Sequence, residues 1–288
     1  MIEVIQTISH MHQVADQLRN AGDRVGLVPT MGYLHEGHLS LITRALEDAN
    51  QVVVSIFVNP TQFGPKEDLA AYPRDLDRDL DLIEKAGAKF AYVPEVEEVY
   101  PEGFATYVNV EGVTDNLCGI SRPEHFKGVT TIVSKLFAAV KPHLAVFGQK
   151  DAQQVLVIQR MVRDLNFDVE VVVAPTVREA DGVAKSSRNV YLTPEERQDA
   201  PALYRALQKG KALIEAGVRD PEEVVRTMRA MINATPYGQI DYVEAVDMDQ
   251  LAPMSALSGQ VLLAVAVYFG KARLIDNVWV EVPRKTPS

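Results

Sequence analysis

The sequence predicts an α/β protein: a large domain with a doubly wound parallel sheet, followed by a smaller C-terminal α+β domain. Two patterns lead to this prediction. Short β-branched runs alternate with amphipathic runs of helical period through residues 1–175, and helices followed by strand-like runs replace this pattern after about residue 185. A chain of 288 residues, 47% hydrophobic, is long enough to bury one large or two modest cores.

The first strand–helix–strand unit spans residues 24–60. Residues 24–31 (RVGLVPTM) form a short apolar run that ends in Pro and Gly, which is typical of a buried strand. Apolar residues at helical spacing predict a helix over 39–50, and the β-branched run 51–60 predicts a second buried strand. Such a unit implies parallel strands joined by a right-handed crossover.

The same alternation continues to residue 175. It predicts helices over 76–87, 130–140 and 151–165 and strands over 89–94, 143–148 and 168–175. We therefore expect a Rossmann-like parallel sheet domain over residues 1–184, with ligands bound outside the carboxyl ends of its strands.

The remaining chain predicts the smaller domain, over residues 185–288, which would close over the site. Thr193 followed by Pro and two Glu residues is typical of a helix start. The apolar patterns predict helices over 194–217 and 221–234 and strands over 240–247, 260–270 and 272–282. The short gap between the last two strands predicts an antiparallel hairpin near Gly270 and Lys271.

Composition excludes several classes of partner. The 29 Lys and Arg against 39 Asp and Glu leave a net charge of −10, which repels a nucleic-acid backbone, so any phosphate site must be local. The single cysteine, Cys118, excludes an internal disulfide and fits a reducing compartment. The N-terminus does not resemble a signal peptide, and no apolar run approaches the length of about 18 residues expected of a membrane span. We expect a cytoplasmic protein without a membrane or nucleic-acid partner.

The stretch PTMGYLHEGHL (29–39) carries two histidines, His35 and His38, where a predicted strand meets a helix. Gly37 and the missing third ligand disfavour a metal site. A strand, a glycine turn and a helix N-terminus offer free N–H groups and a positive dipole end to a phosphate, and glycine allows close approach. The alternative is that His35 only caps a turn and His38 only opens the helix.

Polar groups also follow the next strand and a later one. Asn59 and Gln62 suit a small substrate with hydroxyl and carboxylate oxygens, although Asn-Pro alone would explain a turn. Lys150 opens a helix after Gly148, which is electrostatically unfavourable unless an anion binds there; the alternative is a surface lysine. One of the glutamines at 153 and 154 should face the same crevice.

The segment Lys185–Asn189 gathers two cations, two hydroxyls and an amide between the predicted domains. In a chain of net charge −10 this cluster favours a polyphosphate clamp. A solvated interdomain linker is the alternative interpretation.

Five segments together resemble the pantothenate synthetase (pantoate–β-alanine ligase) family, in its order. They are PTMGYLHEGHLSLI, SIFVNPTQFGP, LCGISRPEHFKGVTTIV, VFGQKDAQQ and VREADGVAKSSRNVYL. The resemblance implies condensation of pantoate with β-alanine, driven by ATP with Mg²⁺ through a pantoyl adenylate, and a homodimer formed through the first domain. Cys118 is then not a nucleophile, since no covalent enzyme intermediate is needed.

The resemblance also implies roles for individual residues. His38 would be the proton donor, His35 its partner on the phosphates, and Asp79 the Mg²⁺ ligand, and Lys150, Ser186 and Arg188 would complete the catalytic set. Pantoate would be held by Gln62, Gln154 and Asn59. The ATP-binding residues would be Met31, Gly32, Tyr33, Leu34, His35, Glu36, Gly37, His38, Gly148, Gln149, Lys150, Asp151, Val177, Lys185, Ser186, Ser187 and Arg188.

Two departures from the family pattern and two rival functions stay open. Gln149 stands where Glu is common, and Lys185 stands where Met or Leu is common, so this extra cation would either tighten ATP binding or lie exposed.

The His-x-Gly-His element is shared with other nucleotidyltransferases, so one rival is such an enzyme acting on a phosphate acceptor, which would need more arginine. The other is a nucleotide-binding regulator without chemistry, which would not need these groups to converge.

Overall fold

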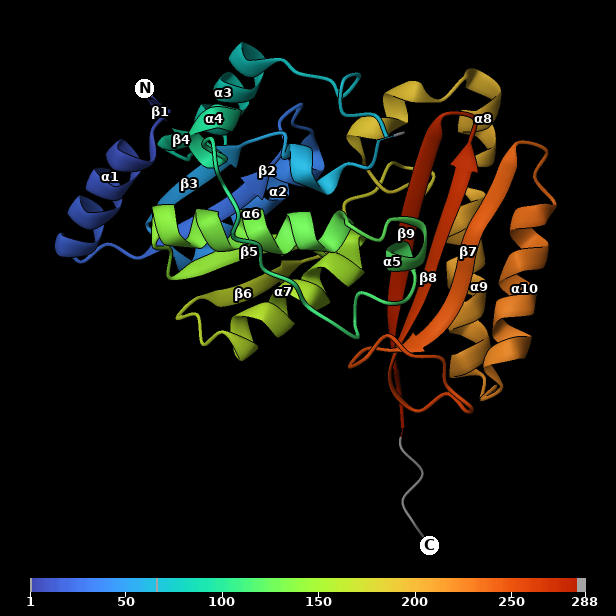
Figure 1. Ribbon diagram of the computed structural model, residues 1–288. Helices are drawn as coiled ribbons and strands as arrows, with labels where there is room; N and C mark the ends of the chain where they lie inside the picture. The colour runs from blue at the N-terminus through green and yellow to red at the C-terminus, as the bar shows by residue number, and fades with distance from the viewer. Residues whose placement is uncertain (1, 66, 284–288) are drawn as a thin grey trace, which may run out of the picture.

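The computed structural model describes residues 2–65 and 67–283. Figure 1 shows two units side by side: an α/β unit built from the first part of the chain, and a three-stranded sheet with its helices built from the last part. This arrangement confirms the predicted fold class. The boundary between residues 184 and 185 stays a prediction, although Val183 already packs in the core of the second unit.

The larger sheet has six parallel strands in the order β1-β4-β3-β2-β5-β6. Its strands are β1 (Glu3–Ile5), β2 (Val25–Thr30), β3 (Gln51–Ile56), β4 (Phe90–Tyr92), β5 (Leu144–Gly148) and β6 (Glu170–Ala174). The chain runs outward from β2 to β4 and then returns to pair β5 with the other side of β2. The strand order therefore reverses between β2 and β5, and a crevice is expected at this point.

Helices cover both faces of this sheet, with a separate apolar cluster on each. The first cluster joins the sheet to α1, α6 and α7, and the second joins it to α2 and α3. The helices are α1 (Ile8–Asn20), α2 (Glu36–Asp48), α3 (Leu76–Lys85), α4 (Val96–Val99), α5 (Cys118–Ser121), α6 (His125–Val140) and α7 (Ala152–Asp164). Short 3-10 turns lie at η1 (Pro60–Gln62), η2 (Gln149–Asp151) and η3 (Ser187–Tyr191).

Several elements differ from their predicted bounds. The short edge strand β1 and helix α1 were not predicted. Helix α2 begins at Glu36 instead of 39, and α6 begins at His125 instead of 130. The predicted helix 194–217 is wrong as a single helix: it breaks before Ala202, because Pro201 has no N–H to continue the helical hydrogen bonds.

The second unit is an antiparallel sheet, β7-β8-β9, with helices on one face. The predicted hairpin is confirmed, since Phe269 pairs with Ala272 across Gly270 and Lys271. These elements are α8 (Pro194–Asp199), α9 (Ala202–Glu215), α10 (Pro221–Asn233), β7 (Gly238–Asp247), β8 (Gly259–Phe269) and β9 (Ala272–Val282).

The two units share an interior. Leu117, Phe126 and Ala152 of the first unit pack with Leu262 and Ala264 of β8 in one buried cluster. The face of the three-stranded sheet opposite its helices is therefore covered by the first unit, and the elements near the start of α6 and α7 are held against it.

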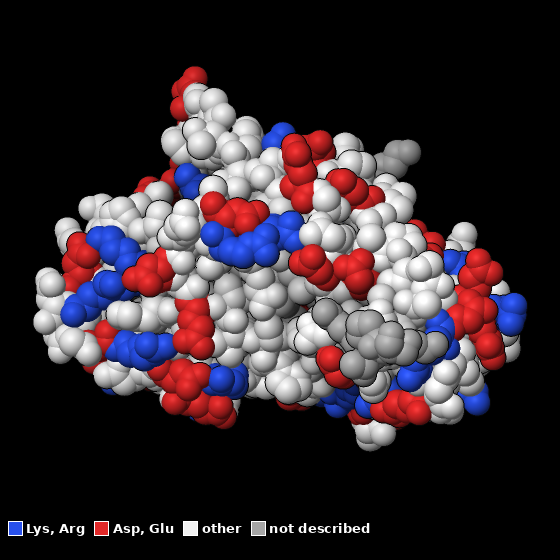
Figure 2. All heavy atoms as spheres, turned by 90° about the horizontal axis from the view of Figure 1, so that it is seen from below, with Lys and Arg blue, Asp and Glu red and all other residues white. Residues whose placement is uncertain are grey.

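Charges on the face seen in Figure 2 are mixed, with Lys and Arg side chains lying among Asp and Glu side chains. Within residues 2–65 and 67–283, no helix has both the length and the apolar character needed to cross a bilayer.

Candidate active site

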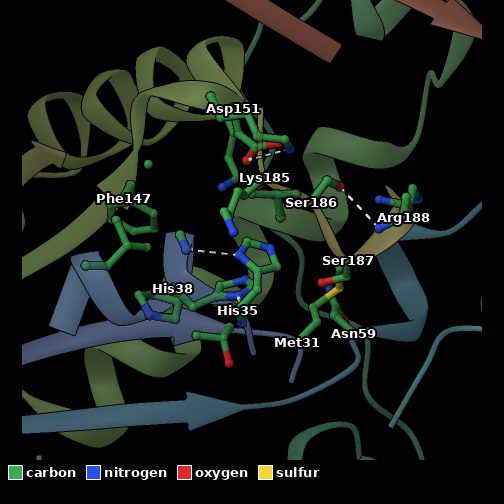
Figure 3. A pocket seen from close by; sticks show the side chains of 18 of the residues that line it. Met31, His35, His38, Asn59, Phe147, Asp151, Lys185, Ser186, Ser187 and Arg188 are labelled. Atoms are coloured by element: carbon green, nitrogen blue, oxygen red, sulfur yellow. Dashed lines mark hydrogen bonds and ion pairs between the residues drawn. The ribbon is translucent and has the colours of Figure 1, made fainter. Parts of the chain in front are cut away.

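A cavity of about 210 Å³ opens at the carboxyl ends of β2, β3, β5 and β6, across the point where the strand order reverses. Figure 3 shows side chains from four separate segments pointing into it. The predicted site residues that line it are Met31, His35, Gly37, His38, Asn59, Gln62, Gly148, Lys150, Asp151, Gln154, Val177, Lys185, Ser186, Ser187 and Arg188. Six others lie outside its lining: Gly32, Tyr33, Leu34, Glu36, Asp79 and Gln149.

The two histidines cap helix α2 and line the cavity at the same time. His35 is the N-cap, and its Nδ1 accepts the Gly37 N–H at 3.1 Å. Nδ1 of His38 accepts the backbone N–H of His35 at 3.3 Å, and the two ring centroids lie 4.1 Å apart. The capping and ligand-binding interpretations are thus compatible. Because both Nδ1 atoms accept, the proton of each neutral ring belongs on Nε2.

Both rings are neutral at neutral pH. Burial, and then the nearby Lys150 ammonium, lower the pKa of His35 to about 4. Burial, followed by the effect of His35, holds the pKa of His38 well below its usual range. A neutral ring with its proton on Nε2 donates a hydrogen bond, and a nearby anion would favour further protonation. This electrostatic state suits the binding of phosphate oxygens.

Gly37 is required by the histidine beside it. A Cβ at this position would lie 2.8 Å from Cε1 and 2.9 Å from Nδ1 of His35, which is too close for either atom. The sequence suggested that this glycine serves the approach of a ligand. The structure adds that it leaves room for the imidazole that caps the helix.

Asp79 holds the loop between β2 and α2 from behind. The loop uses two residues with positive φ, Gly32 at 81° and Tyr33 at 49°. The Asp79 carboxylate accepts the N–H of Tyr33 at 2.6 Å and the N–H of Leu34 at 2.7 Å, and it is 1% exposed. With both oxygens used inside the fold, the geometry does not support Asp79 as a Mg²⁺ ligand. No group of three His, Cys, Asp or Glu suited to a metal ion occurs among the described residues.

The neutral side of the cavity is built on η1. Asn59 is 1% exposed and donates from Nδ2 to Gln62 Oε1 at 3.1 Å and to Gly128 O at 3.0 Å. Tyr100 Oη in turn donates to Asn59 Oδ1 at 2.8 Å. Asn59 thus orients Gln62, in addition to lining the cavity. Gly128 allows this contact, since a Cβ there would lie 2.4 Å from Thr61 O.

The structure distinguishes the two neighbouring glutamines. Gln153 is 6% exposed, its Oε1 accepts the N–H of Cys118, and its Nε2 donates to the carbonyls of Val113 and Asn116. Gln154 lines the cavity instead. Gln153 therefore serves the interior and Gln154 is available to a ligand.

Apolar side chains also line the cavity, together with Gln62 and Gln154, and the sequence did not identify them. This apolar wall consists of Phe57, Val129, Ile132, Val133, Leu136 and Phe147. Most of them belong to α6, a helix buried around much of its circumference. Such a helix has more apolar residues than one core face needs, and this excess was the available sequence signal.

The cations of the 185–188 segment are paired with carboxylates. Lys185 Nζ lies 3.0 Å from Glu36 Oε2 and 3.4 Å from Glu179 Oε2, so this departure from the family pattern is an ion-paired, half-buried lysine. The Arg188 guanidinium binds both Asp68 oxygens, at 3.0 and 2.9 Å. These pairs hold the segment beside the cavity before any anion binds.

The fold and the site define an α/β enzyme whose cationic cavity at the switch point of a parallel sheet suits a nucleotide. A wall of glutamines and apolar side chains beside it suits a second, small substrate. The chain belongs to the pantoate–β-alanine ligase family, whose model matches residues 3–279.

Relatives of the chain include the pantothenate synthetase of Moorella thermoacetica, which is 58% identical over 98% of this chain and 99% of its own length. That of Acetivibrio thermocellus is 54% identical over 98% of this chain and 100% of its own. Similar solved structures include the Thermus thermophilus pantothenate synthetase, with a TM-score of 0.91 and 48% identity, covering 96% of this chain and 99% of that one. The Francisella tularensis pantoate–β-alanine ligase, complexed with β-γ ATP and β-alanine, matches with a TM-score of 0.80 and 31% identity, covering 96% and 97%.

Proposed function

We propose that the protein condenses pantoate with β-alanine to form pantothenate, using ATP and releasing AMP and pyrophosphate. One observation carries the proposal: a single cavity joins phosphate-binding groups to a wall suited to a small branched acid. Its phosphate side has His35, His38 and Lys150, and its other side has Gln62 and Gln154 together with apolar residues. The ligands in the Francisella tularensis complex support the assignment of ATP and β-alanine.

The chemistry has two steps. The pantoate carboxylate attacks the α-phosphorus of ATP, and the bond to the β-phosphate oxygen breaks, which releases pyrophosphate and leaves pantoyl adenylate. The β-alanine amine then attacks the acyl carbon, AMP leaves with the bonding electrons, and the amine loses a proton. Because no group of the enzyme becomes covalently attached, catalysis rests on positioning and on stabilisation of developing charge.

The phosphate side supplies this stabilisation. The neutral Nε2–H groups of His35 and His38 and the Lys150 ammonium donate hydrogen bonds to phosphate oxygens as pyrophosphate leaves. Ser186 and Arg188 add a hydroxyl and a guanidinium from the opposite segment, and Val177 lies on the adenine side. Arg188 must exchange or share its contacts with Asp68 when it binds phosphate.

The other side selects pantoate. Its carboxylate and hydroxyl groups meet the amides of Gln62 and Gln154, and its two methyl groups pack on Val133 and Leu136 of the α6 wall. A phosphate acceptor, as in the rival nucleotidyltransferase function, would instead place doubly charged oxygens against neutral amides and apolar carbon.

Mg²⁺ is part of this proposal. Bound to ATP, it neutralises phosphate charge, and it takes few protein ligands because it keeps several waters. Asp151 is the carboxylate in the cavity lining, its side chain is 45% exposed, and it is the residue that would approach such an ion. A homodimer formed through the first domain and a cytoplasmic location stay predictions.

The test is to incubate the protein with ATP, MgCl₂, pantoate and β-alanine and to follow AMP, ADP and pyrophosphate. AMP formation should require both acids. Formation of AMP without any dependence on pantoate, or of ADP, would overturn the proposal.

A matched pair of variants tests the histidine role. In His38→Asn the new Oδ1 can replace Nδ1 as the acceptor of the His35 N–H, whereas the Nε2–H is lost. Adenylate formation should fall by a factor of about 100 with an unchanged Tm. His10→Asn, at an exposed histidine of α1, should leave the rate unchanged.

A further inference from the structure

We propose that Asn277, on strand β9 of the smaller domain, is a positioning residue that places Lys150 in the phosphate site. This inference rests on the proposed binding of ATP. It makes the second domain part of the phosphate-binding apparatus through a contact outside the cavity itself, since Asn277 does not line it.

The contact is a clamp on consecutive carbonyls. Nδ2 of Asn277 donates to the carbonyl oxygens of Gln149 and Lys150, at 2.9 Å each. Both carbonyls belong to η2, the turn between β5 and α7. The orientation of the amide follows from this geometry, because turning it over would place its oxygen against two carbonyl oxygens.

Burial makes the clamp strong. Asn277 is 3% exposed, and its Oδ1 is buried without a hydrogen-bond partner. A buried oxygen without a hydrogen-bond partner lowers stability, and an apolar residue at this position would avoid that cost. The two hydrogen bonds donated by Nδ2 offset it.

Lys150 depends on the turn for its place. Its side chain is 20% exposed and lines both the cavity and the wider cleft between the two units. With the carbonyls of 149 and 150 held, the start of the Lys150 side chain is fixed relative to β9. Its ammonium lies 3.6 Å from Asp151 Oδ2, and both residues line the cavity together with His35 and His38.

The residue before Asn277 on β9 binds the segment that leads to Lys185, on the other side of the cavity. Asp276 is 4% exposed and binds the Arg178 guanidinium at 2.6 and 2.9 Å. Arg178 also donates to Gly182 O at 3.0 Å, and it pairs with Ala184 in a bridge directly before Lys185. Asp276 and Asn277, adjacent on β9, thus hold two segments that border the cavity. Asn277 binds the turn that carries Lys150, and Asp276 binds Arg178, in the segment that leads to Lys185.

The experiment compares Asn277→Ala with Val278→Ala. Val278 is the next residue of β9, is 8% exposed, and packs in the core of the smaller domain away from η2. ATP affinity is measured by calorimetry without pantoate or β-alanine, at a temperature well below both Tm values. Asn277→Ala should weaken ATP binding about tenfold, since the loss of one hydrogen bond from the Lys150 ammonium has an effect of this order, and Val278→Ala should not.

A double-variant cycle separates positioning from general destabilisation. If Asn277 acts through Lys150, adding Asn277→Ala to Lys150→Ala should weaken ATP binding no further. Additive losses, or an unchanged ATP affinity in Asn277→Ala, would overturn the proposal.

Two provisions keep the outcome clear. If Asn277→Ala does not fold, Asn277→Leu takes its place in every comparison, because its side chain has a similar volume and no hydrogen-bond donor. Because ATP binding is measured directly, failure of the ligase assay in the parent protein would count against the proposed reaction and leave the Asn277 result interpretable.

Discussion

Replacement of Asp79 tests whether this carboxylate supports the loop of the phosphate site or binds a metal. In Asp79→Ala the N–H groups of Tyr33 and Leu34 lose their acceptors. A buried donor left without a partner costs about 1–3 kcal/mol, so the free energy of unfolding should fall by about 2–6 kcal/mol. Asp79→Asn keeps one acceptor oxygen and should lose about 1–3 kcal/mol.

Urea unfolding of these variants, with Asp77→Asn as control, measures the effect. Asp77 lies in the same turn of α3 and is exposed, so its replacement should change stability by less than about 0.5 kcal/mol. The midpoint should shift while the dependence on urea stays constant. The reasoning is refuted if Asp79→Asn is as stable as the control but needs a much higher Mg²⁺ concentration for half-maximal activity, because that is how a metal ligand behaves.

Three further results are expected. Gly37→Ala puts a Cβ 2.8 Å from His35 Cε1, so adenylate formation should fall about tenfold or more with little change in the KM for pantoate; an unchanged rate would mean that the ring need not stay in place. Gly128→Ala puts a Cβ 2.4 Å from Thr61 O and should displace Gln62, which raises the KM for pantoate more than the KM for ATP; equal changes in steady-state assays would contradict this. Burial and the Lys150 ammonium lower the pKa of His35 to about 4 in the folded protein. Between about pH 4 and 6.5 the unfolded chain therefore binds more protons than the folded protein does. The free energy of unfolding should fall as the pH is lowered through this window. His125, whose pKa burial also lowers to about 4, acts in the same direction, so His35→Asn should remove part of this pH dependence in urea titrations; a slope equal to that of the parent would show the assignment to be wrong.

Local patterns explain why much of the fold was predictable. The strands β2, β3 and β5 are short, largely apolar runs with Gly or Pro in or near them, and this pattern depends only on neighbours in sequence. Helix starts were harder. His125 begins α6 five residues before the predicted start, since Lys127 and Gly128 interrupt the apolar pattern while packing against η1 stabilises this turn.

The candidate site was predictable where motifs follow strand ends. His38, Gln62, Lys150 and Arg188 all line one cavity, since parallel strands bring their carboxyl ends to one edge. Asp79 was predicted as the Mg²⁺ ligand, and its position in sequence does not reveal that its two oxygens accept the N–H groups of Tyr33 and Leu34. The roles of Leu136 and Asn277 were not foreseen, because each depends on contacts with residues distant in the chain.

By itself, the sequence determined the class of fold, the family and the polar groups available for chemistry, because periodicity, turn residues and motifs are properties of short segments. The tertiary structure decided which of these groups meet. Histidines that cap a helix reach a cavity, one glutamine of two turns toward it, and an asparagine of the last strand holds the turn that carries Lys150. The reason is that hydrogen bonds and packing between distant segments, which set side-chain direction, have no signature within one segment of sequence.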